Sequence, residues 1–196
     1  NSLSIYVTTG SDTLTVGGAA RFLTFDLTGF AGTLVAASSM RFFGDLVFSS
    51  GMTVGSLAST ITFVKTSGTQ TITTAGKTID QAVTIDGVGG TVSLQDALTL
   101  GSTRTLTLTN GTLTTNGYAV TANTLSSSNS NTRTLNLGAS TVTLTGTGTA
   151  WNITDPTNMT LNAGTSSITT NGNTAAVTFA GGGLTYYNVT FGATYY

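Results

Sequence analysis

Apolar residues alternate with Thr or another polar residue along most of this chain. The pattern is clearest at 3–7 (LSIYV), 106–108 (LTL) and 142–145 (VTLT). Successive side chains of an extended strand point to opposite faces, so the alternation places apolar side chains on one face and hydroxyls on the other. Thr, Val, Ile, Phe and Tyr also favour strands, because β-branched and aromatic side chains fit a pleated surface. We therefore expect an all-β protein.

Short clusters of Gly and Asn interrupt the alternation. Both residue types tolerate the positive backbone φ that tight turns require, so the clusters mark the ends of short strands. They occur at 17–18, 89–90, 110–111, 116–117, 171–172 and 181–183.

The chain also repeats itself. Residues 103–117 (TRTLTLTNGTLTTNG) and 132–146 (TRTLNLGASTVTLTG) share eight of fifteen residues at an offset of 29, and 158–172 (NMTLNAGTSSITTNG) has the same Thr-Leu start and Thr-Thr-Asn-Gly end. Aligned units are spaced by 18 to 29 residues. Their starts fall near Thr62, Thr84, Thr105, Thr134, Thr160 and Thr178.

A strand–turn–strand unit of this length is about one coil of a β-solenoid. One coil cannot bury its own apolar face, but stacked coils form a continuous core. We predict a stacked parallel β-solenoid (β-helix) with irregular coils of about 18–29 residues, with Leu, Val, Ile and Phe inside and Thr, Ser and Asn outside. A β-sandwich or jelly roll is the alternative fold.

The first 80 residues differ from the rest. They hold seven of the nine Phe and eight of the thirteen charged residues, and their repeats are blurred. We predict an aromatic-rich N-terminal β region or cap at 1–80 and a Thr/Gly/Asn-rich repeat solenoid at 81–196, in one continuous body.

Composition excludes several kinds of chemistry. With no Cys and no His, the chain lacks thiolate and imidazole metal ligands, a thiol nucleophile and the usual general base near neutral pH. A net charge of −1 without a basic cluster argues against binding to nucleic acid. We expect no cofactor and no metal. Few charges also suit stacking, because equivalent residues of successive coils lie roughly 4.7–4.9 Å apart and like charges would repel.

The chain begins Asn1-Ser2-Leu3, with neither an initiator Met nor a signal-peptide pattern. We therefore expect a processed chain or a segment of a longer one. No apolar run reaches the roughly 18–20 residues of a membrane helix, so no membrane insertion is expected.

Residues 83–191 resemble repetitive β-rich segments of phage tail-fibre or virion-appendage proteins and of large bacterial surface proteins. The resemblance is carried by VTIDGVGGTVSLQDALTL, TLTLTNGTLTTNGYAVTANTLSSSNSNTRTLNLG, MTLNAGTSSITTNG and TFAGGGLTYYNVTF. It implies a solenoid-like fibre or adhesin segment, and it transfers no catalytic residue.

Asp80, Asp86 and Asp96 are the closest group of carboxylates, which a polysaccharide-degrading β-helix enzyme would need. Structural turn acids are the favoured interpretation, because only Lys77 and Arg104 offer nearby positive charge. Thr-x-Thr pairs are typical of ice-binding solenoids, but the varying coil length is expected to misalign the Thr columns.

The two ends of the solenoid are the predicted sites of self-association, because unpaired strand edges can accept another copy. The residues assigned to this contact are Leu3, Ile5, Val7, Leu184, Tyr186, Val189 and Phe191. Glycosylation sequons, as frequent as chance predicts, occur at Asn110, Asn152, Asn158 and Asn188.

The sequence thus predicts a non-enzymatic structural subunit or segment of an extracellular, cell-surface or virion-surface fibre whose partners are copies of itself. The alternative is a receptor- or glycan-binding adhesin, with sugar contacts from loop 126–131 (SSSNSN) or from Tyr186, Tyr187, Phe191, Tyr195 and Tyr196. A polysaccharide-degrading enzyme and an ice-binding solenoid are less favoured.

Overall fold

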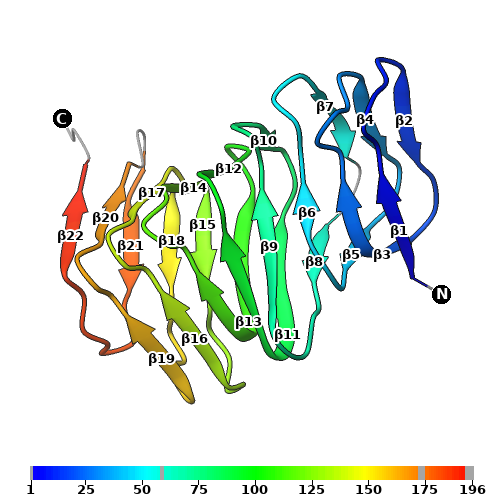
Figure 1. The fold of residues 1–196 in the computed structure, drawn as a ribbon. Helices are drawn as coiled ribbons and strands as arrows, with labels where there is room; N and C mark the ends of the chain where they lie inside the picture. The colour runs from blue at the N-terminus through cyan, green and yellow to red at the C-terminus, as the bar shows by residue number, and fades with distance from the viewer. Residues whose placement is uncertain (1, 58–59, 172–174, 193–196) are drawn as a thin grey trace.

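The computed structural model describes residues 2–57, 60–171 and 175–192. The chain forms a parallel β-solenoid of about 8 turns, with no helix among the described residues. Figure 1 shows the coils stacked side by side, with the two termini at opposite ends of the stack. Every strand pairing is parallel, as the predicted solenoid requires and as a β-sandwich does not. The predicted fold is confirmed.

Each complete coil contributes strands to three faces. Three long strands, β3 (Ala20–Asp26), β11 (Val83–Leu94) and β13 (Thr105–Thr114), turn the corner from face 1 to face 2. Face 1 also contains β5 (Met40–Phe42), β8 (Ile61–Phe63), β15 (Thr124–Ser126), β18 (Gly148–Asn152) and β21 (Val177–Ala180). Face 2 also contains β1 (Leu3–Tyr6), β6 (Leu46–Val47), β9 (Thr69–Thr73), β16 (Arg133–Asn136) and β19 (Met159–Asn162).

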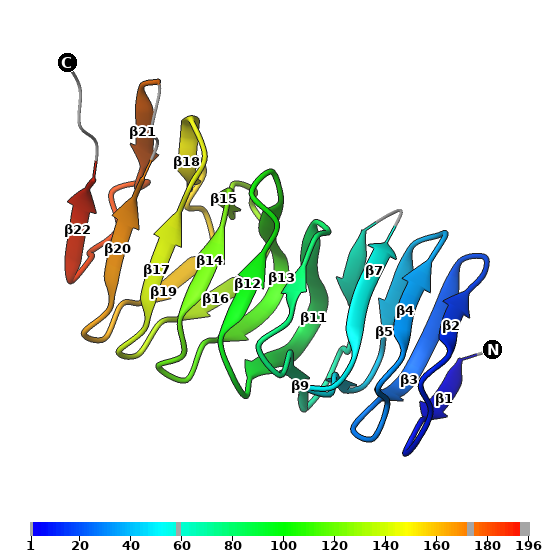
Figure 2. The same cartoon turned by 90° about the horizontal axis from the view of Figure 1, so that it is seen from above.

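Face 3 consists of two shorter sheets in line, whose strands Figure 2 shows as a row. The first sheet contains β2 (Thr13–Val16), β4 (Thr33–Ala36) and β7 (Thr53–Leu57). The second contains β10 (Thr78–Ile79), β12 (Leu98–Leu100), β14 (Val120–Ala122), β17 (Thr141–Leu144), β20 (Ser167–Thr170) and β22 (Asn188–Phe191).

Coil length varies at the corners, whereas the strands stay in register. Paired residues lie between 19 apart (Thr105 and Thr124) and 29 apart (Gly148 and Val177), which agrees with the predicted range. The predicted alignments of Thr62 with Thr84 and of Thr134 with Thr160 are confirmed.

The predicted alignment of Thr105 with Thr134 is wrong. Thr134 lies beside Thr112, and Thr105 lies beside Thr124. The cause is that alternating Thr and Leu occur on faces 1 and 2 alike, so 103–117 and 132–146 match in sequence while occupying different faces.

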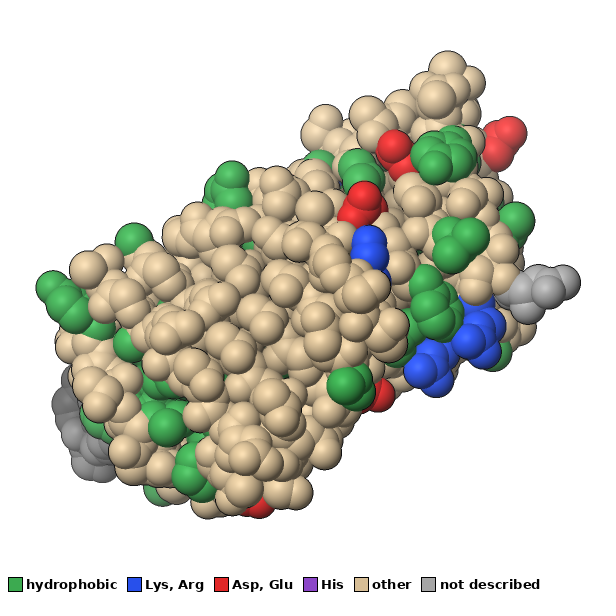
Figure 3. Space-filling view, turned by 60° about the horizontal axis from the view of Figure 1, so that its bottom comes forward, with side chains coloured by type: hydrophobic (Ala, Val, Ile, Leu, Met, Phe, Trp, Pro, Cys, Tyr) green, Lys and Arg blue, Asp and Glu red, His purple; other side chains and the backbone are tan. Residues whose placement is uncertain are grey.

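Charged side chains are few on this solenoid. Figure 3 shows a surface that is mostly uncharged. Arg104 and Asp80 form an ion pair at 2.8 Å, the one salt bridge within the described ranges. Because both side chains are well exposed, this pair adds little to stability.

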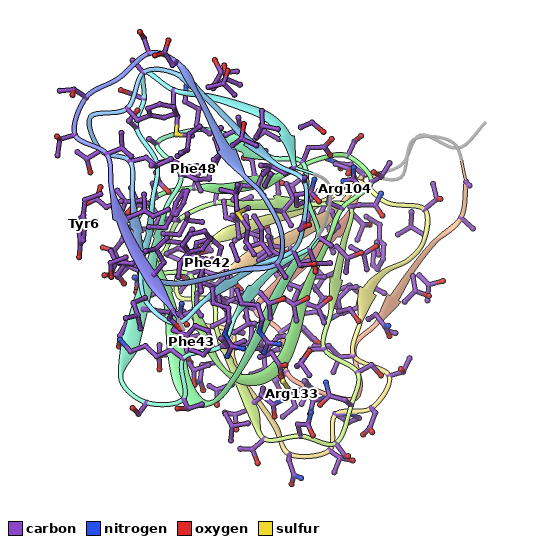
Figure 4. The ribbon with its side chains drawn as sticks, turned by 90° about the vertical axis from the view of Figure 1, so that its right-hand side faces the viewer. Tyr6, Phe42, Phe43, Phe48, Arg104 and Arg133 are labelled. Carbon is purple, nitrogen blue, oxygen red and sulfur yellow. The ribbon has the colours of Figure 1, made fainter. Side chains whose placement is uncertain are left out.

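Apolar side chains form ladders along the inside of the stack. On face 1, Phe22, Phe42 and Phe63 occupy successive coils, and their ring centroids are 5.3 Å apart at each step. Figure 4 looks along the stack from the N-terminal end and shows Phe42 and Phe48 inside the coil, with Tyr6 outside. Full burial of such a side chain contributes about 1.5–3 kcal/mol, so these ladders are the main source of stability.

Gly111 makes the tight corner of β13 possible. Its φ is +77°, and an added Cβ would lie 2.1 Å from the carbonyl oxygen of Gly87 and 2.6 Å from that of Gly90, both in the preceding coil. No side chain fits at these distances, so coils meet here backbone against backbone.

We expect Gly111→Ala to destabilise the protein by more than the roughly 1–2 kcal/mol that a left-handed conformation costs, because the backbone clash adds to it. Gly117→Ala is the matched control, since its φ of +81° is similar and nothing lies within 4 Å of the added Cβ. Chemical denaturation of both variants checks this. Equal losses of unfolding free energy would contradict the role of the clash.

Candidate functional site

The N-terminal end of the stack presents two strands that pair on one side only. Strand β1 pairs with β3, and β2 pairs with β4. Leu3 is 58% exposed, while Ile5 and Val7 are half-buried. A hollow of about 190 Å³ lies between these strands and is lined mainly by Leu3, Ile5, Leu14, Val16, Ala20 and Phe22. Inward-facing apolar side chains of the first coils are therefore uncovered among the described residues.

The C-terminal end has the same character. Strands β19, β21 and β22 each pair only with the preceding coil, through β16, β18 and β20. Leu184, Tyr186 and Val189 are half-buried, and Phe191 is 60% exposed. This end therefore also carries free strand edges beside an apolar interior.

Tyr186 is tied into the last coils. Its hydroxyl accepts a hydrogen bond from Trp151 Nε1 at 3.0 Å and donates one to the Gly181 carbonyl at 2.9 Å. Its ring packs edge-on against Phe179, which stacks on Trp151. Burial raises the pKa of Tyr186 above its ordinary value. Tyr187 is 66% exposed instead. The predicted contacts of Tyr195 and Tyr196 lie outside the described residues.

The three grouped carboxylates each serve a neighbouring coil or corner. Asp80 accepts from Arg104 Nε at 2.8 Å, which lowers the pKa of this carboxyl. Asp86 accepts from the Asn110 amide at 2.6 Å. Asp96 accepts from the backbone N–H groups of Thr74 and Ala75 at 2.8 and 2.6 Å. No group of three or more metal-ligating side chains occurs in the described part of the chain.

The lysines considered as possible catalytic partners bind backbone carbonyls. The Lys65 ammonium donates to Thr69 and the Lys77 ammonium to Ser50, at 2.8 and 2.7 Å.

The four sequon asparagines hold coils together. Each side-chain amide donates to the preceding coil: Asn110 to Asp86 Oδ1 at 2.6 Å, Asn152 to Ser126 Oγ at 3.3 Å, Asn158 to the Ser130 carbonyl at 2.9 Å and Asn188 to Ser167 Oγ at 3.2 Å. Attachment of a glycan at the same nitrogen would compete with these bonds.

Arg133 is a feature that the sequence analysis missed. It lies on the inside of face 2, between Gly111 and Met159 in neighbouring coils, and is 1% exposed. Burial lowers its pKa and the nearby Asp155 raises it, but an arginine stays protonated. Figure 4 places Arg133 at a corner of the coil.

All five N–H groups of Arg133 donate to the protein. Nε bonds the Ser127 hydroxyl, Nη1 bonds the carbonyls of Asn131 and Thr157, and Nη2 bonds the carbonyls of Ser127 and Asp155, at 2.5–2.8 Å. Two successive corner loops are thus fastened to one buried cation.

Thr columns run along the outside of two faces. On face 3 one outward position is Thr in six successive coils (Thr78, Thr99, Thr121, Thr143, Thr169 and Thr190). On face 2 another is Thr in five (Thr69, Thr91, Thr112, Thr134 and Thr160). The expectation that variable coil length misaligns these columns is wrong, because the extra residues lie in the corners.

The fold and its uncovered ends define the protein as a parallel β-solenoid with free strand edges. Comparisons with models of known protein families, with curated proteins and with solved structures found no match to this chain. Within the described ranges there is no helix that could cross a membrane.

Proposed function

We propose that this chain is a non-enzymatic structural segment of an extracellular, cell-surface or virion-surface fibre, in which copies stack end to end. The observation that carries the proposal is that strands at both ends pair on one side only and leave apolar interior side chains uncovered. A free strand edge is a template for another strand, and an uncovered apolar patch favours a partner.

The two ends are compatible with each other face by face. The C-terminal end offers β21 on face 1, β19 on face 2 and β22 on face 3. The N-terminal end offers β3 and β1 on faces 1 and 2 and β2 on face 3. Contact between unlike ends is heterologous and does not close, so repetition gives a filament. Parallel pairing inside the solenoid would then continue across the junction.

We expect the double variant Ile5→Lys/Val189→Lys to prevent assembly, because a charge buried in an apolar junction costs several kcal/mol unless it is paired. Both residues are half-buried at the ends. The matched control is Thr99→Lys/Thr143→Lys, which adds the same charge in the middle of face 3. Negative-stain electron microscopy should show filaments for wild type and control, and single particles for the end variant.

A cross-link tests the order of the copies. The chain contains no Cys, so Thr15→Cys/Thr190→Cys introduces one thiol at each end of face 3. Neighbouring strands place Cα atoms within disulfide range, so oxidation should give covalent multimers. Monodisperse monomers at every concentration, without cross-linked species, would overturn the proposal.

A further inference from the structure

A notch interrupts the corner between faces 1 and 2. The register pairs Thr107 with residues of both neighbouring coils, and likewise Thr112. Between these two Thr the chain uses four residues (108–111), whereas the preceding coil uses six (85–90) and the following coil seven (127–133). The middle corner is therefore set back, which leaves a cavity of about 340 Å³ between its neighbours.

The lining of this corner notch is polar and comes from three coils. Val88 belongs to one wall, Asn110 and Thr112 to the floor, and Asn131 and Thr134 to the other wall. Thr112 and Thr134 are register neighbours in the face 2 column, so their hydroxyls lie one strand spacing apart. The cavity falls in the range of about 300–1,000 Å³ that is typical of small-molecule pockets.

The polar groups of the notch leave a specific set of bonds open. Asn110 Nδ2 donates to Asp86 Oδ1 at 2.6 Å and Asn131 Nδ2 to the Thr109 carbonyl at 3.1 Å, so each amide keeps its oxygen as an acceptor. The hydroxyls of Thr112 and Thr134 have no hydrogen-bond partner in the described part of the protein. Two acceptors and two hydroxyls therefore remain for a ligand.

Charge decides which ligand suits these groups. Arg133 borders the notch, but its five N–H groups are all bonded to the protein, so none can bind an anion. The Asp86 carboxylate is engaged by Asn110. A neutral polyol matches the open acceptors and hydroxyls, and Val88, 64% exposed, can pack against C–H groups.

We propose that the corner notch binds one residue of a neutral glycan, a hexose or an N-acetylhexosamine. The notch lies on the side of the stack, between free ends, so the proposal holds whether or not copies assemble end to end. It assigns the glycan-binding role to Asn131 of the predicted loop, together with two Thr and an Asn from other coils.

The test is binding of the full chain to an array of neutral and acidic glycans, followed by titration of the best neutral glycan. Wild type should bind neutral glycans, and Thr112→Val/Thr134→Val should bind about tenfold more weakly, because two hydroxyl hydrogen bonds are lost while side-chain shape is kept. The control Thr121→Val/Thr143→Val removes two neighbouring hydroxyls from face 3 and should bind as wild type does.

Three outcomes would overturn the assignment: no neutral glycan is bound, only acidic glycans are bound, or both double variants bind equally. A loss of binding with Tyr187→Ala instead would place the sugar at the C-terminal aromatics. Microscopy of the same samples reports assembly separately, so failure of the notch and failure of the fibre proposal are distinguishable.

Discussion

Replacement of Arg133 by Ala is expected to lower the free energy of unfolding by about 3–5 kcal/mol, among the larger effects of single substitutions. The guanidinium fills an inward position and satisfies four backbone carbonyls and the Ser127 hydroxyl. Without it, buried acceptors from loops 127–131 and 155–157 lose their donors, and each unsatisfied group costs about 1–3 kcal/mol.

Two further variants separate hydrogen bonding from packing. Arg133→Met restores much of the volume but no donor, and the carbonyls belong to the backbone and stay in place. We therefore expect Met to recover little stability and Lys to recover part of it, because an ammonium offers three donors without the planar fork. Urea denaturation, with limited proteolysis at 127–131, measures both. A Met variant as stable as wild type would show that the hydrogen bonds contribute nothing.

Replacement of Phe42 by Ala is expected to cost about 3–5 kcal/mol, the usual range for a buried aromatic. Its ring is fully buried between those of Phe22 and Phe63, so the substitution opens a cavity across three coils and removes two stacked contacts. Because a solenoid coil is stabilised by its neighbours, the loss should spread to the adjacent coils.

The next residue in the chain is the matched control. Phe43 points outward, where its ring lies 4.9 Å from the Arg21 guanidinium. Phe43→Ala should cost about 1 kcal/mol, since it loses partial burial and one exposed cation–π contact. Thermal and urea denaturation of the two variants check the contrast. Similar losses for both would contradict the inward assignment of Phe42.

The fold could be predicted because alternation and repetition point to the same structure. Stretches such as 106–108 and 142–145 define which side chains face inward, and the repeats require stacking. The register could not be predicted, since Thr and Leu alternate on every face in the same manner. Only the corner lengths, which the structure supplies, decide that Thr134 lies beside Thr112.

The ends could be anticipated from apolar alternation, whereas Arg133 could not. Arg133, Leu135 and Leu137 follow the inward period of two, and so do Arg104, Leu106 and Leu108. Yet Arg104 is partly exposed and pairs with Asp80, while Arg133 is buried. The difference arises from the corner loop above Arg133, whose carbonyls surround the guanidinium. The corner notch depends in the same way on three corner lengths at once.

The stacking of parallel coils also fixes how this protein responds to force. Hydrogen bonds between coils point along the axis of the stack, so tension applied to its ends acts along the bonds themselves. A coil adds about 5 Å to the length of the stack, but about 22 residues become up to roughly 70–80 Å of extended chain once released. Because each coil depends on its neighbours, release should proceed coil by coil from an end. A fibre of such segments would lengthen many-fold and dissipate work before it parts.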